Sequence, residues 1–184
     1  MNLDKHDLRK SAHRRRAEAF SVVDIAPALK NLQKILAETQ GAISFYWPIR
    51  SEIDPRPVME KFSFTRTVCL PVTHGRDAPL SFRRWKVGGE MDLDGFGVSV
   101  PVEEELVTPS VLVVPMLAFD DRCHRLGYGA GHYDRTLFEL RKNGPVQAFG
   151  FAFSAQGENK PLPIEATDEP LDAIVTEAGV IYPN

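Results

Sequence analysis

Residues 110–135 read SVLVVPMLAFDDRCHRLGYGAGHYDR, and this stretch decides the fold. Residues 110–114 form a short valine-rich run closed by Pro115, which is typical of a buried strand. A loop then leads to three alternating glycines at 127, 129 and 131, and a helix is expected over residues 132–142. A buried strand followed by a crossover loop and a helix is the repeating unit of an α/β protein.

The flanking sequence continues this alternation. Helices are predicted over residues 4–19 (with Asp4 as the N-cap), 27–39 and 58–64. Strands are predicted over 42–47, 67–71, 80–87 (an edge strand), 146–153, 173–176 and 180–182, and residues 88–97 read as a hairpin or flexible loop. We therefore expect one domain over residues 1–184, a layered α/β/α fold with a mostly parallel, Rossmann-like central sheet.

The composition is that of a globular domain that needs no disulfide or metal to fold. The 184 residues are 43% hydrophobic and 26% charged, with a net charge of −3. The two cysteines stand in unrelated contexts, which argues against a zinc site. Cys69 lies in an apolar run and is expected to be an inert core thiol, whereas Cys123 lies in a polar loop where a thiol can react.

Several partner classes are disfavoured by the charge and hydropathy patterns. The N-terminus has no apolar leader, and no apolar run reaches the length of a membrane span, so a cytoplasmic protein without membrane contact is expected. One short basic patch on a net-acidic chain is weak support for nucleic-acid binding. The expected partners are small molecules, and the expected state is a monomer or a weak homodimer.

The glycine-rich turn is the strongest candidate for a binding site. Gly127, Gly129 and Gly131 let the backbone approach a ligand closely, and the following helix N-terminus favours anions. The turn lacks the ending of a Walker loop and the spacing of a dinucleotide fingerprint. Arg125 and Arg135 bracket it with positive charge suited to phosphate. Asp134 could hold magnesium against phosphates, or could serve equally well as an acid that stabilises the helix dipole.

The run RLGYGAGHYDR at residues 125–135 resembles the signature of the 5-formyltetrahydrofolate cyclo-ligase family, which is close to RLGxGxGYYD. Four further stretches resemble the family in the same order: KHDLR at 5–9, FYWPIRSEID at 45–54, PMLAFD at 115–120 and DEPLDAIVT at 168–176. The resemblance therefore covers nearly the full chain. It implies a layered fold similar to that of the sugar-phosphate isomerase and CoA-transferase group.

The resemblance also implies a reaction and a set of roles. The reaction is the ATP- and Mg²⁺-dependent closure of 5-formyltetrahydrofolate to 5,10-methenyltetrahydrofolate, with ADP and phosphate released, through a phosphorylated formyl group. The implied catalytic residues are Arg125 and Tyr133, and the implied Mg²⁺ ligands are Asp134 and Asp168. The implied ATP contacts are Lys5, Arg9, Arg125, Leu126, Gly127, Tyr128, Gly129, Ala130, Gly131, His132 and Tyr133. The implied folate contacts are Trp47, Glu52, Tyr128, Gly129, Ala130, Gly131 and His132.

For some of these residues the plain structural role is as good an explanation, and for Glu52 it is the better one on sequence alone. Trp47 could stack on a pterin or fill the core, and Glu52 could accept pterin N–H groups or be an ordinary loop acid. Arg14 could add a phosphate contact, but a solvated basic face is the better interpretation for Arg14 to Arg16.

The sequence departs from the family pattern at three positions. Ala130 stands where many members have glycine or a basic residue, His132 replaces the first tyrosine of the usual pair, and Met116 replaces a glycine. Residues 92–107 match poorly. These departures put fine substrate contacts in question more than the reaction class. Two other functions stay open: folate or nucleotide binding without turnover, and chemistry like that of the isomerase and CoA-transferase group.

Overall fold

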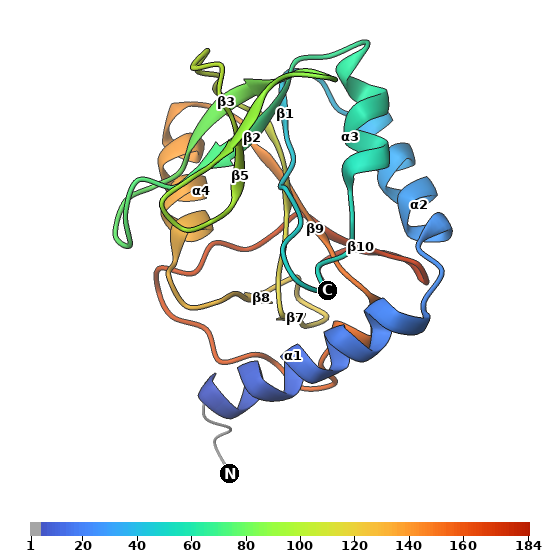
Figure 1. The fold of residues 1–184 in the computed structure, drawn as a ribbon. Coiled ribbons are helices and arrows are strands. Elements are labelled where there is room, and N and C mark those ends of the chain that lie inside the picture. The colour runs from blue at the N-terminus through green and yellow to red at the C-terminus, as the bar shows by residue number, and fades with distance from the viewer. Residues whose placement is uncertain (1–4) are drawn as a thin grey trace.

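The computed structural model describes residues 5–184, and its core is a seven-stranded sheet (Figure 1). The strand order is β11-β10-β9-β6-β1-β2-β3. The five inner strands are parallel, whereas the edge strands β3 and β11 run antiparallel to their neighbours. The bounds of these strands are β1 Ile43–Ser44, β2 Val68–Val72, β3 Ser81–Trp85, β6 Val111–Val114, β9 Gln147–Phe151, β10 Ala173–Thr176 and β11 Gly179–Ile181.

Helices cover both faces of this sheet, as the predicted α/β/α layering requires. On one face, α2 (Ala26–Ala37) and α3 (Arg56–Ser63) pack on the apolar cluster that contains Val111 and Val113. On the other, α4 (His132–Asn143) packs on the cluster that contains Leu112 and Val114. Side chains alternate across a strand, so β6, buried on both faces, reads as a continuous apolar run in the sequence. In Figure 1, α2 and α3 lie to the right of the sheet and α4 to the left.

The first helix, α1 (Lys5–Val22), does not belong to either layer. It runs below the sheet in Figure 1, beside a small hairpin formed by β7 (Ala118–Phe119) and β8 (Arg125–Leu126). Leu8 and Ala12 of the helix join Leu126 of the hairpin in a separate apolar cluster. The hairpin was not predicted, because each strand has only two residues and the loop around it is polar. The predicted cap Asp4 lies outside the described residues.

Most predicted elements are present, with shifted ends. Helix α3 begins at Arg56 rather than at residue 58, because Pro57 falls in its first turn, where proline is tolerated. Strand β1 pairs only over Ile43–Ser44, although a strand was predicted over residues 42–47. Residues 88–97 belong to a hairpin of β4 (Met91–Leu93) and β5 (Ser99–Pro101), so the hairpin alternative was correct.

Both cysteines are free and buried, which confirms the prediction for Cys69 and answers the question left open for Cys123. Burial raises the pKa of the Cys69 thiol to about 12, as expected for an inert core thiol. The reactivity of Cys123 was left open, and the structure argues against it, because the side chain is fully buried and burial raises its pKa to about 11. Its neighbours in the loop are polar, yet its own side chain joins the cluster beneath α4. No helix within residues 5–184 has the length and apolar character to cross a membrane.

Candidate active site

A cleft of about 1060 Å³ opens where the parallel strands end. Trp47 follows β1, Thr73 follows β2 and Pro115 follows β6, and all three line it. Strand β2 lies on one side of β1, and β6, which comes later in the chain, lies on the other. The strand order therefore reverses between β1 and β6. In open α/β sheets, ligands bind in the crevice at this reversal, outside the carboxyl ends of the strands. The fold therefore dictates the position of the cleft.

The glycine-rich turn forms one wall of the cleft and leads into α4. Gly129 and Gly131 have φ angles of 99° and 67°, in the left-handed region that a side chain disfavours. A Cβ at Gly129 would also lie 3.2 Å from the guanidinium of Arg9. Gly131 caps α4, and the first turn of the helix lines the cleft. The unpaired N–H groups and the dipole of that terminus favour an anion here.

Two cations of α1 reach the same wall, one helical turn apart. The Nε of Arg9 donates a hydrogen bond to the carbonyl oxygen of Gly127 at 3.1 Å. The Nζ of Lys5 lies 2.6 Å from Glu165 Oε1 and 3.9 Å from Asp168 Oδ2. The ammonium of Lys5 lowers the pKa of the Glu165 carboxyl. Lys5 and Arg9, four residues apart on one face of α1, therefore lie together at the mouth of the turn.

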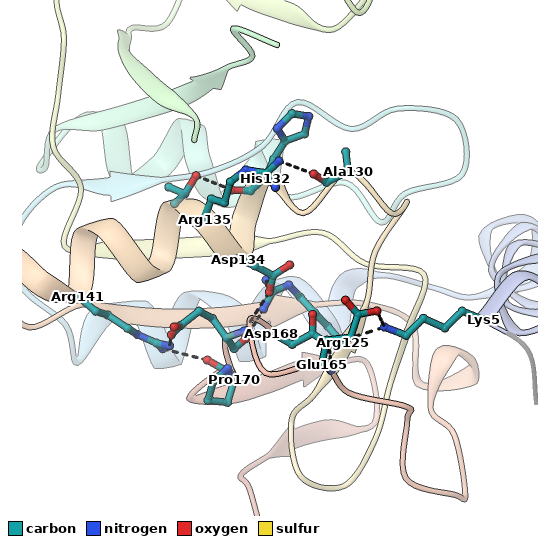
Figure 2. Close-up of polar contacts among 12 residues, drawn as sticks. Lys5, Arg125, Ala130, His132, Asp134, Arg135, Arg141, Glu165, Asp168 and Pro170 are labelled. Atoms are coloured by element: carbon teal, nitrogen blue, oxygen red, sulfur yellow. Dashed lines mark hydrogen bonds and ion pairs between the residues drawn. The ribbon is translucent and has the colours of Figure 1, made fainter. Parts of the chain in front are cut away.

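The base of the cleft holds an ion pair between Arg125 and Asp134 (Figure 2). Arg125 Nη2 lies 2.5 Å from Asp134 Oδ1, and its side chain is only 6% exposed. The backbone of Glu169 bridges the pair: its N–H donates to Asp134 Oδ1 at 3.0 Å, and its carbonyl accepts from Arg125 Nη1 at 2.6 Å. Arg141 in turn binds the carboxylate of Glu169 at 2.6 Å. Burial lowers the pKa of Arg125, and the charges of Asp134 and Asp168 oppose this.

A further arginine supports the outer side of the glycine turn. Arg135 Nη2 donates to the carbonyl oxygen of Ala130 (Figure 2). It also donates to the carbonyl oxygen of Arg76 at 2.5 Å. His132 Nδ1 lies 3.2 Å from the carbonyl oxygen of Ala78. These contacts tie the turn to the segment that follows β2. Arg135, which was expected beside the turn as a cation for phosphate, therefore bonds to backbone oxygens here.

The opposite wall, after β1, contains Trp47 and Glu52. Trp47 is partly buried: it packs against the core and also lines the cleft, and the guanidinium of Arg56 lies 5.0 Å from its ring centre. Both roles considered for Trp47 are thus compatible with its position. Glu52 is only 4% exposed. Its Oε2 accepts the N–H of Ile49 at 2.9 Å, and its Oε1 accepts the hydroxyl of Tyr128 at 2.8 Å.

Burial controls the ionisation of three groups in this region. It raises the pKa of Glu52, although the N–H of Ile49, the Tyr128 hydroxyl and the charge of Arg16 all lower it. Burial also raises the pKa of Tyr128 to about 12, and the pKa of Tyr133 above its ordinary range. Both tyrosines are therefore neutral hydrogen-bond donors at physiological pH.

Two carboxylates, Asp134 and Asp168, were predicted to hold Mg²⁺. Their side chains are 24% and 30% exposed, and both line the cleft. Both hydrogen bonds that Asp134 accepts go to Oδ1. Within residues 5–184, no group of three or more histidine, cysteine or acidic side chains is placed to enclose a metal. Two hard oxygen donors fit Mg²⁺, which proteins usually hold with one or two carboxylates and substrate phosphates.

The structure brings all the predicted site residues together, because every one of them lines this cleft. They are Lys5, Arg9, Trp47, Glu52, Arg125, Leu126, Gly127, Tyr128, Gly129, Ala130, Gly131, His132, Tyr133, Asp134 and Asp168. The alternatives for Asp134 are not exclusive: it is a first-turn acid of α4 and also faces the cleft.

One residue beside the site, Arg16, does not lie where it was expected. Arg16 was placed on a solvated face, but it is 1% exposed. The signal was present in the sequence: Arg16 follows the buried residues Leu8 and Ala12 at intervals of four, on the same helical stripe. Arg14, at 75% side-chain exposure and paired with Glu18, does lie on the solvated face and does not line the cleft.

Comparison with known proteins agrees with this geometry. Residues 2–177 match the sequence profile of the 5-formyltetrahydrofolate cyclo-ligase family. The chain is 33% identical to the 5-formyltetrahydrofolate cyclo-ligase of Escherichia coli (strain K12) over 147 residues, which cover 75% of this chain and 79% of that protein. It is 31% identical to the Haemophilus influenzae cyclo-ligase over 136 residues, 70% and 72% of the two chains.

Solved structures show the same fold. The NMR structure of the Aquifex aeolicus 5,10-methenyltetrahydrofolate synthetase superimposes with a TM-score of 0.76 and 28% identity, covering 97% of this chain and 92% of that one. The Mycoplasma pneumoniae synthetase superimposes with a TM-score of 0.70 over 94% and 98% of the two chains, and at 20% identity it supports the fold alone.

Proposed function

Because the chain belongs to the 5-formyltetrahydrofolate cyclo-ligase family, we propose that it uses ATP and Mg²⁺ to convert 5-formyltetrahydrofolate into 5,10-methenyltetrahydrofolate, ADP and phosphate. The family consists of ligases, so the chain is an enzyme and not a binding protein without turnover. One observation carries the proposal: a single cleft joins a cationic glycine turn on one side to a tryptophan and a buried carboxylate on the other.

The glycine turn is the proposed phosphate side. Backbone N–H groups at the start of α4, together with Lys5 and Arg9, would face the triphosphate of ATP. Lys5 now pairs with Glu165, whose side chain is 65% exposed, and a phosphate would compete for the same ammonium. Arg125 is held in one orientation by Asp134 and by the Glu169 carbonyl, so its charge is placed before the substrates bind.

The wall after β1 is the proposed folate side. The partly exposed ring of Trp47 offers a flat apolar surface to the pterin. The carboxylate of Glu52 would accept pterin N–H groups, which are strong contacts when the acceptor is charged. The hydroxyl of Tyr128 holds one oxygen of Glu52 in place, and Tyr128 itself belongs to the glycine turn. The two walls therefore meet at this tyrosine, which brings the formyl group close to the phosphates.

Asp134 and Asp168 are the proposed Mg²⁺ ligands, and their chemistry fits this ion as described above. When bound, Mg²⁺ would neutralise charge on the phosphate oxygens. Arg125 holds Asp134, and the N–H of Glu165 binds Asp168 Oδ2 at 2.8 Å, so both carboxylates have fixed orientations. The contribution of the protein to metal binding is thus to position the two carboxylates.

The proposed chemistry has two steps. The formyl oxygen attacks the γ-phosphorus of ATP and the bond to the β-phosphate oxygen breaks, which releases ADP. The neighbouring folate nitrogen then attacks the activated carbon and loses its proton, and the formyl oxygen leaves as part of phosphate. Phosphorylation turns a poor leaving group into a good one, while the protein mainly positions two substrates and neutralises charge. Tyr133 lines the cleft and is neutral at physiological pH, so its hydroxyl would donate a hydrogen bond to the substrates.

An isotope experiment tests this route. The enzyme is given 5-formyltetrahydrofolate that carries ¹⁸O in the formyl group, and the released phosphate is analysed by mass spectrometry. The proposal predicts one ¹⁸O atom in each phosphate. Unlabelled phosphate formed together with methenyl product would show that the formyl oxygen does not attack phosphorus.

A further inference from the structure

The side chain of Arg16 is a buried cation with no role in the chemistry described so far. It lies on α1 and is 1% exposed, whereas Arg14, two residues earlier, has 75% of its side chain exposed. Burying a guanidinium is costly unless its N–H groups find acceptors and its charge is paired. The groups that bind Arg16 therefore indicate which parts of the structure the buried guanidinium holds in place.

Those partners come from two segments far apart in the sequence. Nη1 of Arg16 donates to the hydroxyl of Tyr128 at 2.7 Å, and Nε donates to Ser51 Oγ at 3.2 Å. Nη1 also lies 3.7 Å from Glu52 Oε1. Tyr128 passes the contact on, since its hydroxyl donates to the same Glu52 oxygen at 2.8 Å. Arg16, Tyr128 and Glu52 thus form a closed triangle between α1, the glycine turn and the loop after β1.

These contacts fix the direction of the Tyr128 hydroxyl and the orientation of the Glu52 carboxylate. With its oxygen accepting from Arg16, the Tyr128 hydroxyl has its proton directed at Glu52, so the tyrosine acts as a donor there. The guanidinium lies 5.5 Å from the centre of the Tyr128 ring, which adds a cation–π contact. Glu52 is held from two directions, by Tyr128 at Oε1 and by the N–H of Ile49 at Oε2.

We propose that Arg16 is a positioning residue for folate: it fixes the carboxylate of Glu52 and the hydroxyl of Tyr128 from behind, outside the cleft. The inference rests on the proposed function, since it assigns a role through two residues placed at the folate side. Arg16 does not line the cleft, so its effect on substrate is indirect. Loss of Arg16 should therefore weaken folate binding more than ATP binding.

The ionisation of Glu52 supports this role. Burial raises its pKa, and the positive charges of Arg16 and Arg50 act in the opposite direction. The phenols of Tyr46, Tyr128 and Tyr133 also face Glu52, and burial keeps all three neutral. His13 of α1 packs its ring against Tyr128, and burial and the charges of Arg16 and Arg50 lower its pKa. Removal of the Arg16 charge should move the protonation of Glu52 to a higher pH, which a purely structural contribution of Arg16 would not do.

The test compares Arg16→Met and Arg16→Lys with Arg14→Met, the matched change on the solvated face of the same helix. Isothermal titration calorimetry measures binding of 5-formyltetrahydrofolate and of ATP from pH 5 to 8. For Arg16→Met we expect the folate Kd to rise about tenfold or more, the scale of a lost hydrogen bond to a charged group, with a smaller change for ATP. In Arg16→Met, the loss of folate affinity on the acid side (the acidic limb of folate binding) should begin at a higher pH than in the wild type. In Arg16→Lys this limb should stay near its wild-type position.

A double-mutant cycle covers the case in which Arg16→Met does not fold. Arg16→Lys keeps the charge but loses the guanidinium that bonds to Tyr128 and Ser51, so it should weaken folate binding less than Arg16→Met does. It is combined with Tyr128→Phe, and their effects on folate affinity should be non-additive, because both changes remove the hydrogen bond between Arg16 and the Tyr128 hydroxyl. Equal folate affinity in wild type and folded Arg16→Met, or additive effects in the cycle, would overturn the role of Arg16 alone. A wild-type protein that binds no 5-formyltetrahydrofolate would overturn the proposed function, and this role with it.

Discussion

Arg125 and Asp134 form an ion pair at 2.5 Å that joins β8 to the first turn of α4 at the base of the cleft. The pair places a fixed cation and a carboxylate side by side where the glycine turn meets the helix. A bound phosphate needs a cation beside it and a bound metal ion needs a carboxylate, and this pair supplies one of each.

Asp134→Asn should lower turnover by about 100-fold or more, because removing one preorganised electrostatic group from an active site has effects of this size. The asparagine keeps the shape of the side chain and loses its charge. Formation of methenyl product is followed by absorbance, and thermal melting reports the fold. Glu60→Gln, which removes an exposed acid from α3, is the control and should retain activity. Full activity in Asp134→Asn would remove the residue as a metal ligand.

Lys5→Ala should raise the KM for ATP by about tenfold, as expected when one charge-assisted contact is lost, and should change the KM for folate less. Lys10→Ala removes an exposed lysine of the same helix and should leave both constants near their wild-type values. The measurement is initial rate against each substrate with the other saturating. An unchanged ATP dependence in Lys5→Ala would contradict the phosphate role.

Trp47→Ala should weaken folate binding by about tenfold, since it removes both a stacking contact and buried apolar area. Trp85, which is partly buried on β3 and does not line the cleft, provides the matched control Trp85→Ala. Fluorescence titration with folate and a melting curve are recorded for both variants. If Trp47→Ala binds folate normally, or if it loses a cooperative melt, Trp47 is a core residue and not a folate contact.

As the pH falls, folate binding should begin to weaken at a higher pH than it would if Glu52 had the pKa of an ordinary glutamate. Burial raises the pKa of Glu52 above 4.5, so the carboxylate takes up its proton earlier as the pH falls, and a protonated carboxyl is a poorer acceptor for pterin N–H groups. The folate Kd is measured from pH 4.5 to 8 in wild type and in Glu52→Gln. The variant should bind weakly and lose this acidic limb; the same limb in both proteins would assign it to another group.

Neither thiol should react in the folded protein. The pKa of Cys69 is raised to about 12 and that of Cys123 to about 11, and both side chains are buried, so little thiolate is present or accessible at pH 8. A chromogenic disulfide reagent should label both cysteines only after denaturation. Rapid labelling of Cys123 in the native protein would show that its loop opens.

The sequence predicted the features that depend on local pattern. The valine run of β6, the glycine turn and the amphipathic face of α2 each appear as periodicity or composition, so the layered fold was predictable. The candidate site was identified from the family resemblance, and the fold then brought residues from both ends of the chain to one cleft.

Tertiary contacts outweighed local character at two positions. Arg16 and Cys123 both lie in strongly polar stretches, yet each side chain is buried. Arg16 finds its partners in Tyr128 and Ser51, which are distant in the sequence, so local charge wrongly placed it in solvent. Cys123 points into the cluster beneath α4, while the chain around it is polar. The β7–β8 hairpin was missed because its strands are too short to show a period.

The most direct test of the central claim is the absorbance of the methenyl product formed by purified protein with 5-formyltetrahydrofolate, ATP and Mg²⁺, against mixtures that lack each component in turn. We expect product only in the complete mixture, with ADP and phosphate formed in equal amounts. Product formation without ATP would contradict the proposed phosphorylation. Folded protein that binds ATP but makes no product in the complete mixture would contradict the cyclo-ligase assignment itself.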